Sequence, residues 1–232
     1  MTSFIEIFCD FDGTITTVDS VDFLLEELAH PSWHEVEARW ERGEIGSRQC
    51  MSEQVGLIEG GWPAVERALA RVHIDPTFPA FVAWCRQQGI ALRIVSDGLD
   101  RTIDHVLSRE GLAVDTVIAN HVVELADGRL SLTFPYEART SGCVSGVCKC
   151  EILGACPASR TKVFIGDGRS DFCAAGAADV LFAKKKLADH CRLNGIPFVG
   201  YDNFSEIRAH IETVLLPKVT VVPPVAAPAP AL

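Results

Sequence analysis

Apolar residues along this chain follow two spacings, and each spacing predicts a different kind of secondary structure. Short apolar runs bounded by turn residues predict buried strands; these lie at Phe4–Cys9, Ile90–Val95, Thr116–Ala119, Thr161–Ile165, Val180–Phe182 and Pro197–Gly200, with a hairpin at His121–Glu124 and Arg129–Thr133. Apolar residues at i, i+3 and i+4 predict helices; these lie at 20–30, 33–42, 47–58, 62–72, 77–88, 99–109 and 204–216, with short helices near Lys149–Leu153 and from about Ser170. Because strands alternate with helices, the fold class is α/β, with a parallel sheet covered on both faces.

One long segment departs from this alternation. No strand is predicted between residues 17 and 75, so that block is an all-helical insertion into the sheet domain. The last stretch is rich in Pro, Ala and Val and has no period, which is typical of disorder. We therefore divide the chain into a Rossmann-like core at 1–16 and 77–216, a helical cap at 17–76 and a disordered tail at 217–232.

Composition narrows the class of protein. With 232 residues, 48% of them hydrophobic, the chain can bury one good core plus a small cap. A net charge of −10 argues against a nucleic-acid or anionic-membrane partner. No stretch approaches the roughly 20 apolar residues of a membrane span, and the N-terminus begins the first strand without a signal peptide. We expect a cytoplasmic protein, a monomer or a homodimer.

Three polar clusters fall where predicted strands end. They read Asp10-Phe11-Asp12-Gly13-Thr14, Ser96-Asp97-Gly98 and Gly166-Asp167-Gly168-Arg169-Ser170-Asp171. In open parallel sheets, ligands bind outside the carboxyl ends of the strands, where the strand order reverses. The three clusters are therefore expected to meet in one site.

The carboxylates of the first and last clusters predict a metal site. Asp10 and Asp12 are like charges two residues apart behind a buried strand, and a divalent cation relieves their repulsion. A helix-capping or turn role explains one such Asp but not the pair. With Asp167 and Asp171 they form an all-oxygen set that suits Mg²⁺ and leaves room for a substrate phosphate.

Other residues predict a phosphate-binding site. The Ser96 hydroxyl, the neighbouring amides of Asp97 and Gly98, and the turn at Gly13-Thr14 could hold an anion. No His is placed to activate Ser96 as a nucleophile, so we interpret Ser96 as a phosphate-binding residue. The alternative is that Ser96 only caps a helix. Lys149 could neutralise Asp10 and a phosphoryl group; taken alone it would read as a solvated lysine.

In this order, Asp10-x-Asp12-Gly13-Thr14, Ser96, Lys149 and Gly166-Asp167-x-x-x-Asp171 resemble the four motifs of the haloacid dehalogenase (HAD) superfamily. The helical block resembles the C1 cap of its phosphoserine phosphatase-like branch, and the match spans residues 4 to about 215. Asp10–Thr17 with Asp19, followed by Pro31-x-Trp33, is similar to the phosphatases of methionine salvage. The pair Cys148-Lys149 is shared with that group and with phosphocholine/phosphoethanolamine phosphatases.

The resemblance implies a Mg²⁺-dependent phosphomonoesterase acting on a small phosphorylated metabolite. Asp10 would be the nucleophile that forms an aspartyl-phosphate, and Asp12 the acid and then the base. Asp10, Asp12, Asp167 and Asp171 would hold Mg²⁺, while Thr14, Ser96, Asp97, Gly98 and Lys149 would bind the phosphoryl group. The presence of Asp12 argues against dehalogenase chemistry, because that reaction has no leaving oxygen to protonate. Phosphoserine and phosphocholine or phosphoethanolamine remain alternative substrates, and a non-catalytic phospholigand- or zinc-binding regulatory protein is an alternative class.

Substrate choice is expected to come from the cap. Its polar and aromatic candidates are Asp19, Arg39, Trp40, Arg42, Ser47 and Arg48, although most charged residues on such helices are solvated. Asp19 is the best placed of them, because it lies close to the first motif in the sequence.

Nine cysteines form two groups. Cys9, Cys50, Cys85, Cys173 and Cys191 are scattered through apolar or helical segments, as reduced core residues are. Cys143, Cys148, Cys150 and Cys156 are clustered with the spacing C-x4-C-x-C-x5-C. They could bind a structural Zn²⁺ that orders the segment bearing Lys149, sense redox state, or be ordinary thiols near a loop.

Overall fold

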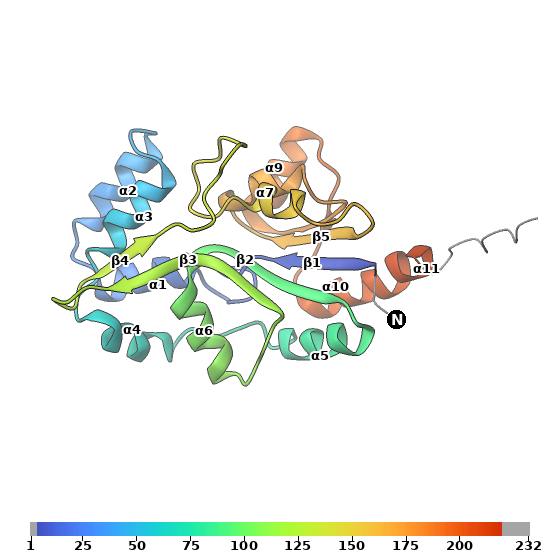
Figure 1. Ribbon diagram of the computed structural model, residues 1–232, viewed down its shortest axis with the longest axis horizontal. Coiled ribbons are helices and arrows are strands. Elements are labelled where there is room, and N and C mark those ends of the chain that lie inside the picture. The colour runs from blue at the N-terminus through green and yellow to red at the C-terminus, as the bar shows by residue number, and fades with distance from the viewer. Residues whose placement is uncertain (1–3, 220–232) are drawn as a thin grey trace, which may run out of the picture.

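The computed structural model describes residues 4–219 and contains one seven-stranded sheet with the order β4-β3-β2-β1-β5-β6-β7 (Figure 1). All neighbouring strands are parallel except the β3–β4 hairpin. The strands are β1 (Ile5–Cys9), β2 (Ala91–Leu99), β3 (Thr116–Glu124), β4 (Leu130–Thr133), β5 (Thr161–Gly166), β6 (Val180–Ala183) and β7 (Val199–Gly200). The chain adds strands first on one side of β1 and then on the other, so the switch point predicted for ligand binding lies beside β1. The α/β class is confirmed.

Helices cover both faces of this sheet (Figure 1). They are α1 (Ser20–Leu28), α2 (Trp33–Glu41), α3 (Ser47–Val55), α4 (Gly61–Leu69), α5 (Phe78–Gln88), α6 (Asp100–Arg109), α7 (Lys149–Gly154), α8 (Phe172–Ala175), α9 (Lys185–Asn194), α10 (Phe204–His210) and α11 (Leu216–Val219), with a 3-10 turn η1 (Arg169–Asp171) and a π-helical turn η2 (Ile211–Leu215). The four helices predicted before residue 75 are all present. Helix α9 was not predicted, because its buried stripe has only three residues, Leu187, Ala188 and Cys191.

Helix boundaries follow local capping chemistry. Helix α1 begins after Asp19, whose carboxylate accepts the N–H groups of Val21 and Asp22. Helix α5 ends at Gly89, which adopts the left-handed conformation that glycine allows.

The sequence predicted that the second strand ends at Val95, before the polar residues. The structure shows a longer strand. Strand β2 continues through Ser96, Asp97 and Gly98 to Leu99, and its register against β3 shifts between Val95 and Leu99. Pairing of Leu99 with Asn120 on β3 keeps this polar segment in the sheet. The irregularity aims side chains of β2 at the carboxyl end of β1, as bulges commonly do near functional sites.

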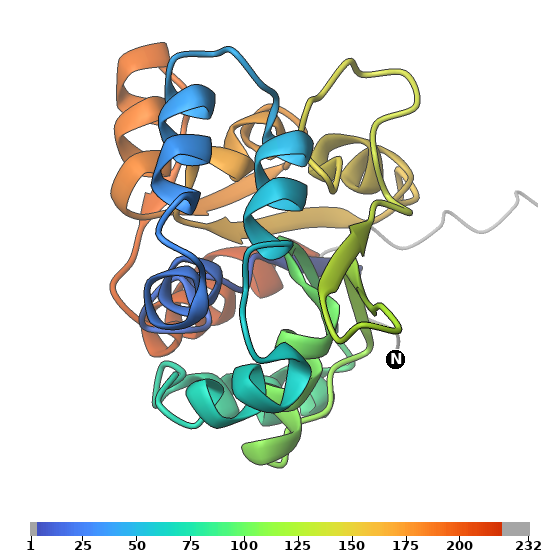
Figure 2. The same cartoon turned by 90° about the vertical axis from the view of Figure 1, so that its left-hand side faces the viewer.

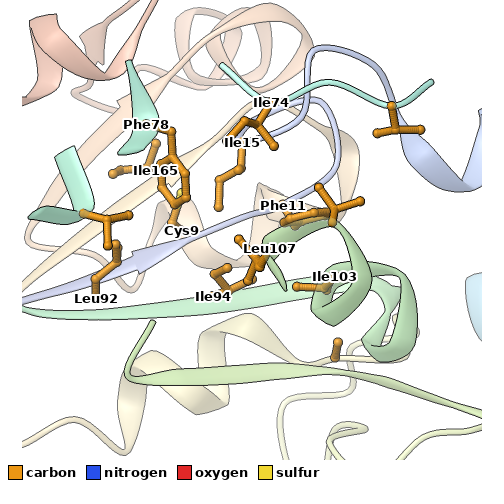
Figure 3. Packing of buried hydrophobic residues seen from close by; sticks show 14 of the residues in the cluster. Cys9, Phe11, Ile15, Ile74, Phe78, Leu92, Ile94, Ile103, Leu107 and Ile165 are labelled. Atoms are coloured by element: carbon orange, nitrogen blue, oxygen red, sulfur yellow. The ribbon is translucent and has the colours of Figure 1, made fainter. Parts of the chain in front are cut away.

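The sheet and the ends of the helical insertion share one hydrophobic core (Figure 3). All five residues of β1 are buried. Phe11 and Ile15, which follow β1, pack with Ile74 and Phe78 from the other end of the insertion. An isolated bridge between Thr16 and Ile74 joins the two connecting segments.

The predicted cap contains two differently packed parts. Helices α1 and α4 bury Leu24, Leu25, Val65 and Leu69 in the main core. Helices α2 and α3 (residues 33–55, hereafter the lid) form a separate small cluster around Val36, Ile45 and Cys50. Figure 2 looks along the sheet and shows the lid helices in front of it, beyond the carboxyl ends of the parallel strands. The 17–76 boundary stays a prediction, but only the lid has a core of its own among the helices of that block.

The predicted tail is described only at its beginning. Residues 217–219 belong to helix α11, and residues 220–232 lie outside the described part of the chain. None of the helices within residues 4–219 has the length and apolar character needed to cross a lipid bilayer.

Candidate active site

Asp10, Lys149 and Asp171 form a buried charged triad beside the carboxyl end of β1. The Lys149 ammonium lies 2.9 Å from Asp10 Oδ1 and 2.5 Å from Asp171 Oδ1. Lys149 is fully buried, and its pKa is raised: burial alone would lower it, but Asp10 and Asp171 outweigh that effect. Lys149 therefore carries its charge throughout the physiological pH range.

Asp10 is placed to act through its free oxygen. Its Oδ1 accepts both the Lys149 ammonium and the N–H of Phe11, at 2.9 and 2.8 Å. Burial and the nearby Asp171 raise the pKa of Asp10, while Lys149 opposes the rise. A cation near this carboxylate favours its ionised form, which is the nucleophilic one.

Asp12 has separate partners from Asp10, although the two side chains follow the same strand only two residues apart. Its Oδ1 accepts the backbone N–H of Ser20 at 2.9 Å and also the Ser20 hydroxyl. Its Oδ2 lies 3.5 Å from the Ser96 hydroxyl. Desolvation and then the charge of Asp19 raise the pKa of Asp12 to about 7. A carboxyl group that titrates near neutrality can both give and take a proton.

Asp167 links the first and last motifs and has a cationic partner that the sequence did not reveal. Its Oδ1 accepts the Thr14 hydroxyl at 2.9 Å, and its Oδ2 lies 3.0 Å from the Lys185 ammonium. The same ammonium donates to the carbonyl oxygen of Gly13 at 3.0 Å. Lys185 is the one non-glycine residue with positive φ in residues 4–219, and such strain is common at functional sites. In the sequence, the only indication of this contact was the run Lys184-Lys185-Lys186, and such a run is typical of the solvated first turn of a helix.

Three carboxylates fit a hard divalent cation. One oxygen from each of Asp10, Asp167 and Asp171 lies within 4.8 Å of the others, and all three residues are buried. Asp171 also stabilises the backbone of its own motif, because its Oδ2 accepts the N–H groups of Asp167 and Gly168 at 3.0 and 2.9 Å. With Oδ1 on Lys149, both of its oxygens have partners. Asp167 likewise has partners on both oxygens, Thr14 and Lys185, so a metal would share these carboxylates with them. An all-oxygen set suits Mg²⁺.

Close packing explains two glycines of the motifs. A Cβ on Gly98 would come within 2.1 Å of Asp12 Oδ2, and a Cβ on Gly13 within 2.5 Å of Asp167 Oδ2. Gly13 also has φ of +69°, which favours glycine. These positions lack side chains because carboxylates occupy the space.

The predicted phosphate-binding residues at 96–98 lie together, but they differ in whether their polar groups are free to contact a phosphate. The Ser96 hydroxyl accepts the N–H of Gly98 at 3.0 Å and faces Asp12. The Asp97 carboxylate points elsewhere: it accepts the N–H of Val147 at 2.9 Å and the Asn120 amide at 3.2 Å. Ser96 and the backbone at 97–98 thus remain candidates for phosphate contact, whereas the Asp97 side chain orders the segment before Lys149.

The cap residues proposed from sequence have structural partners. Asp19 caps helix α1, Ser47 accepts the Trp40 indole N–H at 3.1 Å, and Arg48 pairs with Glu137. A role for Asp19, Ser47 or Arg48 in substrate binding stays a prediction. One lid contact does reach the motifs: the Arg169 guanidinium lies over the Trp40 ring, 4.8 Å from its centroid.

We expect Trp40→Ala to raise KM by about 2–5-fold with a smaller change in kcat, because an exposed cation–π contact contributes roughly 0.5–1 kcal/mol. Loss of that contact weakens the packing of the lid on the Arg169 segment. Steady-state kinetics of Trp40→Ala and of the control Trp40→Phe, which keeps an aromatic ring, measure the effect. An unchanged KM in Trp40→Ala would show that the contact between Trp40 and Arg169 does not contribute to substrate binding.

The cysteine cluster differs from the set predicted by spacing. The Sγ atoms of Cys143, Cys148 and Cys150 lie within 4.8 Å of one another. Cys156 is not among them; its thiol lies 3.4 Å from Glu6 Oε2. The structure places Cys156 apart from the other three thiols, because Cys148 and Cys150 lie at the N-terminal end of helix α7 and Cys156 lies beyond its C-terminal end.

Comparisons with known proteins identify a family and several relatives of this chain. A family described as haloacid dehalogenase-like hydrolase matches residues 7–176. A 2-hydroxy-3-keto-5-methylthiopentenyl-1-phosphate phosphatase of Brevibacillus brevis is 29% identical, over 87% of this chain and 92% of that protein. The phosphatase of the same name from Microcystis aeruginosa is 31% identical, over 88% of this chain and 96% of the other.

The fold has a solved counterpart. The phospho-aspartyl intermediate analogue of a phosphoserine phosphatase superposes with a TM-score of 0.68 at 19% identity, covering 90% of this chain and 99% of the other. At that identity the likeness concerns the fold, which is the HAD-like sheet with helices that the resemblance in sequence implied.

Proposed function

We propose a mechanism and a substrate for this chain, which belongs to the haloacid dehalogenase-like hydrolases and is a phosphatase. It hydrolyses a small phosphate monoester through an aspartyl-phosphate on Asp10. The observation that carries the proposal is the buried Asp10–Lys149–Asp171 triad with Asp12 beside it on separate partners.

In the first step, Asp10 attacks phosphorus and the bond to the leaving oxygen breaks. Lys149, held by Asp171, offsets negative charge on the transferring group and favours the ionised form of Asp10. Asp12 gives its proton to the leaving oxygen, so the product leaves as an alcohol or enol. Ser20 and Ser96 hold the Asp12 carboxyl in place for this transfer.

In the second step, water replaces the alcohol. Asp12, now ionised, takes a proton from water as the water oxygen attacks the phosphorus of the aspartyl-phosphate. The bond from phosphorus to Asp10 breaks, which releases inorganic phosphate and restores both carboxyl groups. Asp12 thus exchanges one proton in each half of the cycle.

Mg²⁺ is the metal this site suits, and Asp10, Asp167 and the backbone at Asp12 would hold it, with Asp171 in support. It supplies charge stabilisation for the phosphoryl oxygens when bound. Lys185 shares Asp167 Oδ2 and the Gly13 carbonyl, so its ammonium lies beside the proposed metal position. With the metal bound, both charges would act on the Asp167 carboxylate.

The proposed substrate is 2-hydroxy-3-keto-5-methylthiopentenyl-1-phosphate, the compound in the names of the relatives. The charges of the lid support a substrate with an uncharged tail. All three lid arginines already pair with carboxylates: Arg39 with Glu53, Arg42 with Glu44 and Arg48 with Glu137. Phosphoserine, by contrast, carries a carboxylate and an ammonium that need charged partners. Met51, which contacts Asn120 on β3, places a thioether on the sheet side of the lid.

A panel of phosphorylated metabolites tests this proposal. We expect release of inorganic phosphate with kcat/KM at least ~100-fold higher for the methylthio-ketose phosphate than for phosphoserine or phosphocholine, which corresponds to about 2.7 kcal/mol. Removal of Mg²⁺ with a chelator should abolish turnover, and added Mg²⁺ should restore it. A preference for phosphoserine would reject the substrate but keep the mechanism, whereas Mg²⁺-independent turnover would reject the mechanism.

Location and assembly follow from this function only as expectations. A small-metabolite phosphatase with a net charge of −10 is expected to be cytoplasmic and to need neither nucleic acid nor membrane as a partner. Every residue of the mechanism comes from one chain, so a monomer or a homodimer could carry it out.

A further inference from the structure

Three thiols meet next to the catalytic lysine, and a fourth thiol from a separate segment lies near them. Cys150 Sγ lies 3.6 Å from Cys143 Sγ and 3.4 Å from Cys148 Sγ. The fourth thiol belongs to Cys173 on helix α8; it lies near the thiols of Cys143 and Cys150 but outside the group whose sulfur atoms are within 4.8 Å of one another. Cys148 is fully buried and the other three are partly buried. Because Cys173 lies 23 residues beyond Cys150, spacing along the chain gave no sign of it.

We propose that Cys143, Cys148, Cys150 and Cys173 form a structural Zn²⁺ site. Structural zinc sites are tetrahedral, and four Cys ligands are one of their common sets. A Zn–S distance of ~2.3 Å places the sulfur atoms of a tetrahedron about 3.8 Å apart. The separations of 3.4 and 3.6 Å at Cys150 are close to this value, and the Cys173 side chain would move toward these three sulfur atoms to complete the tetrahedron.

The surroundings of the thiols fit a metal centre. The Ser141 hydroxyl lies 3.0 Å from Cys148 Sγ, where it can donate to a thiolate, as outer groups do around metal ligands. The Glu151 carboxylate accepts the N–H groups of Arg139, Thr140 and Ser141, which fixes the loop that carries Cys143. These amide bonds lower the pKa of Glu151 to about 2. These hydrogen bonds hold the beginning of the Cys143 loop against helix α7.

The position of the site gives it a function. Lys149 stands between Cys148 and Cys150, and Cys173 follows Asp171 by two residues. A zinc ion held by these thiols would join the segment that delivers Lys149 to the segment that delivers Asp171. The 2.5 Å contact between those two side chains holds Lys149 on Asp10. Zinc would therefore position the catalytic lysine without touching the substrate, and this role rests on the proposed function.

Metal analysis of the purified full-length protein tests the site. We expect about one zinc ion per chain, retained after dialysis that removes Mg²⁺, and loss of most of it in Cys173→Ser. The matched control is Cys156→Ser, because Cys156 belongs to the cluster by sequence spacing but contacts Glu6 in the structure. That variant should keep its zinc.

Cobalt substitution keeps the proposal testable if Cys173→Ser folds poorly. Co²⁺ bound to the wild-type chain should give the sulfur-to-cobalt charge-transfer and d–d bands of a tetrahedral thiolate site, with lower intensity in the Cys173→Ser chain. Absence of zinc and of these bands from a folded protein with free thiols would overturn the proposal. A disulfide between two of the four cysteines would also overturn it, in favour of redox chemistry. Because the readout is metal content, the result does not depend on which substrate the enzyme hydrolyses.

Discussion

Asp10→Asn is expected to abolish phosphatase turnover, lowering kcat by roughly 10⁴–10⁶-fold, as loss of the nucleophile does in other enzymes with a covalent intermediate. Asn has the same shape, and its oxygen can still accept the N–H of Phe11 and the Lys149 ammonium. It cannot form an acyl phosphate, because an amide is not a nucleophile at phosphorus. The fold should remain intact, with an unchanged near-UV circular dichroism spectrum.

Asp115→Asn is the matched control for this variant. Its carboxylate also accepts a backbone N–H, that of Leu92 at 2.7 Å, but at the opposite end of β2 from the site. We expect wild-type turnover in Asp115→Asn under identical conditions. Substantial activity in Asp10→Asn would mean that another residue attacks phosphorus.

Lys149→Met should damage both stability and activity. The substitution leaves Asp10 and Asp171 buried together without their cation, and breaking a buried ion pair in this way costs about 3–5 kcal/mol. It also removes a charge from the phosphoryl site, which lowers kcat by roughly 10²–10³-fold. Urea unfolding and steady-state kinetics measure the two effects separately.

The stability loss in Lys149→Met should depend on pH. Burial and Asp171 already raise the pKa of Asp10, and removal of Lys149 raises it further. A carboxyl whose folded-state pKa exceeds its unfolded value favours folding at low pH and loses that contribution as pH rises. In the presence of a chelator, the deficit against wild type should therefore be larger at about pH 8 than at about pH 5.

A double variant tests whether Lys149 stabilises the fold through its charge or through its packing. Lys149→Met/Asp171→Asn removes one of the two buried charges and should recover part of the stability without recovering activity. A pH-independent deficit that the second change does not reduce would show that Lys149 matters for its packing against the surrounding side chains and not for its charge.

The elements that the sequence predicted well are those whose signal is local. Helices α1–α4 carry their apolar stripes within a few residues, and β1 is a continuous buried run behind Asp10. The motif residues could be placed at one edge of the sheet because parallel strands share their carboxyl ends. The structure brings Asp10, Asp12, Ser96, Lys149 and Asp167 together there.

The features that were missed depend on contacts distant in sequence. Ser96 belongs to a strand only because Leu99 pairs with Asn120. Cys173 lies near the thiol cluster because helix α8 packs beside α7, and nothing in the 22 residues between Cys150 and Cys173 indicates it. Lys185 reaches Asp167 through a left-handed backbone conformation that a lysine rarely adopts. Such pairings are set by the tertiary fold, which no local pattern encodes.

The covalent intermediate can be trapped on its residue. Rapid quenching of the enzyme during turnover, followed by borohydride reduction, converts an aspartyl-phosphate to homoserine at the phosphorylated position, and peptide mass spectrometry identifies that position. We predict homoserine at residue 10, dependent on substrate and absent from Asp10→Asn. Homoserine at Asp12 or Asp167, or a complete lack of reduction during fast turnover, would show that Asp10 is not the nucleophile.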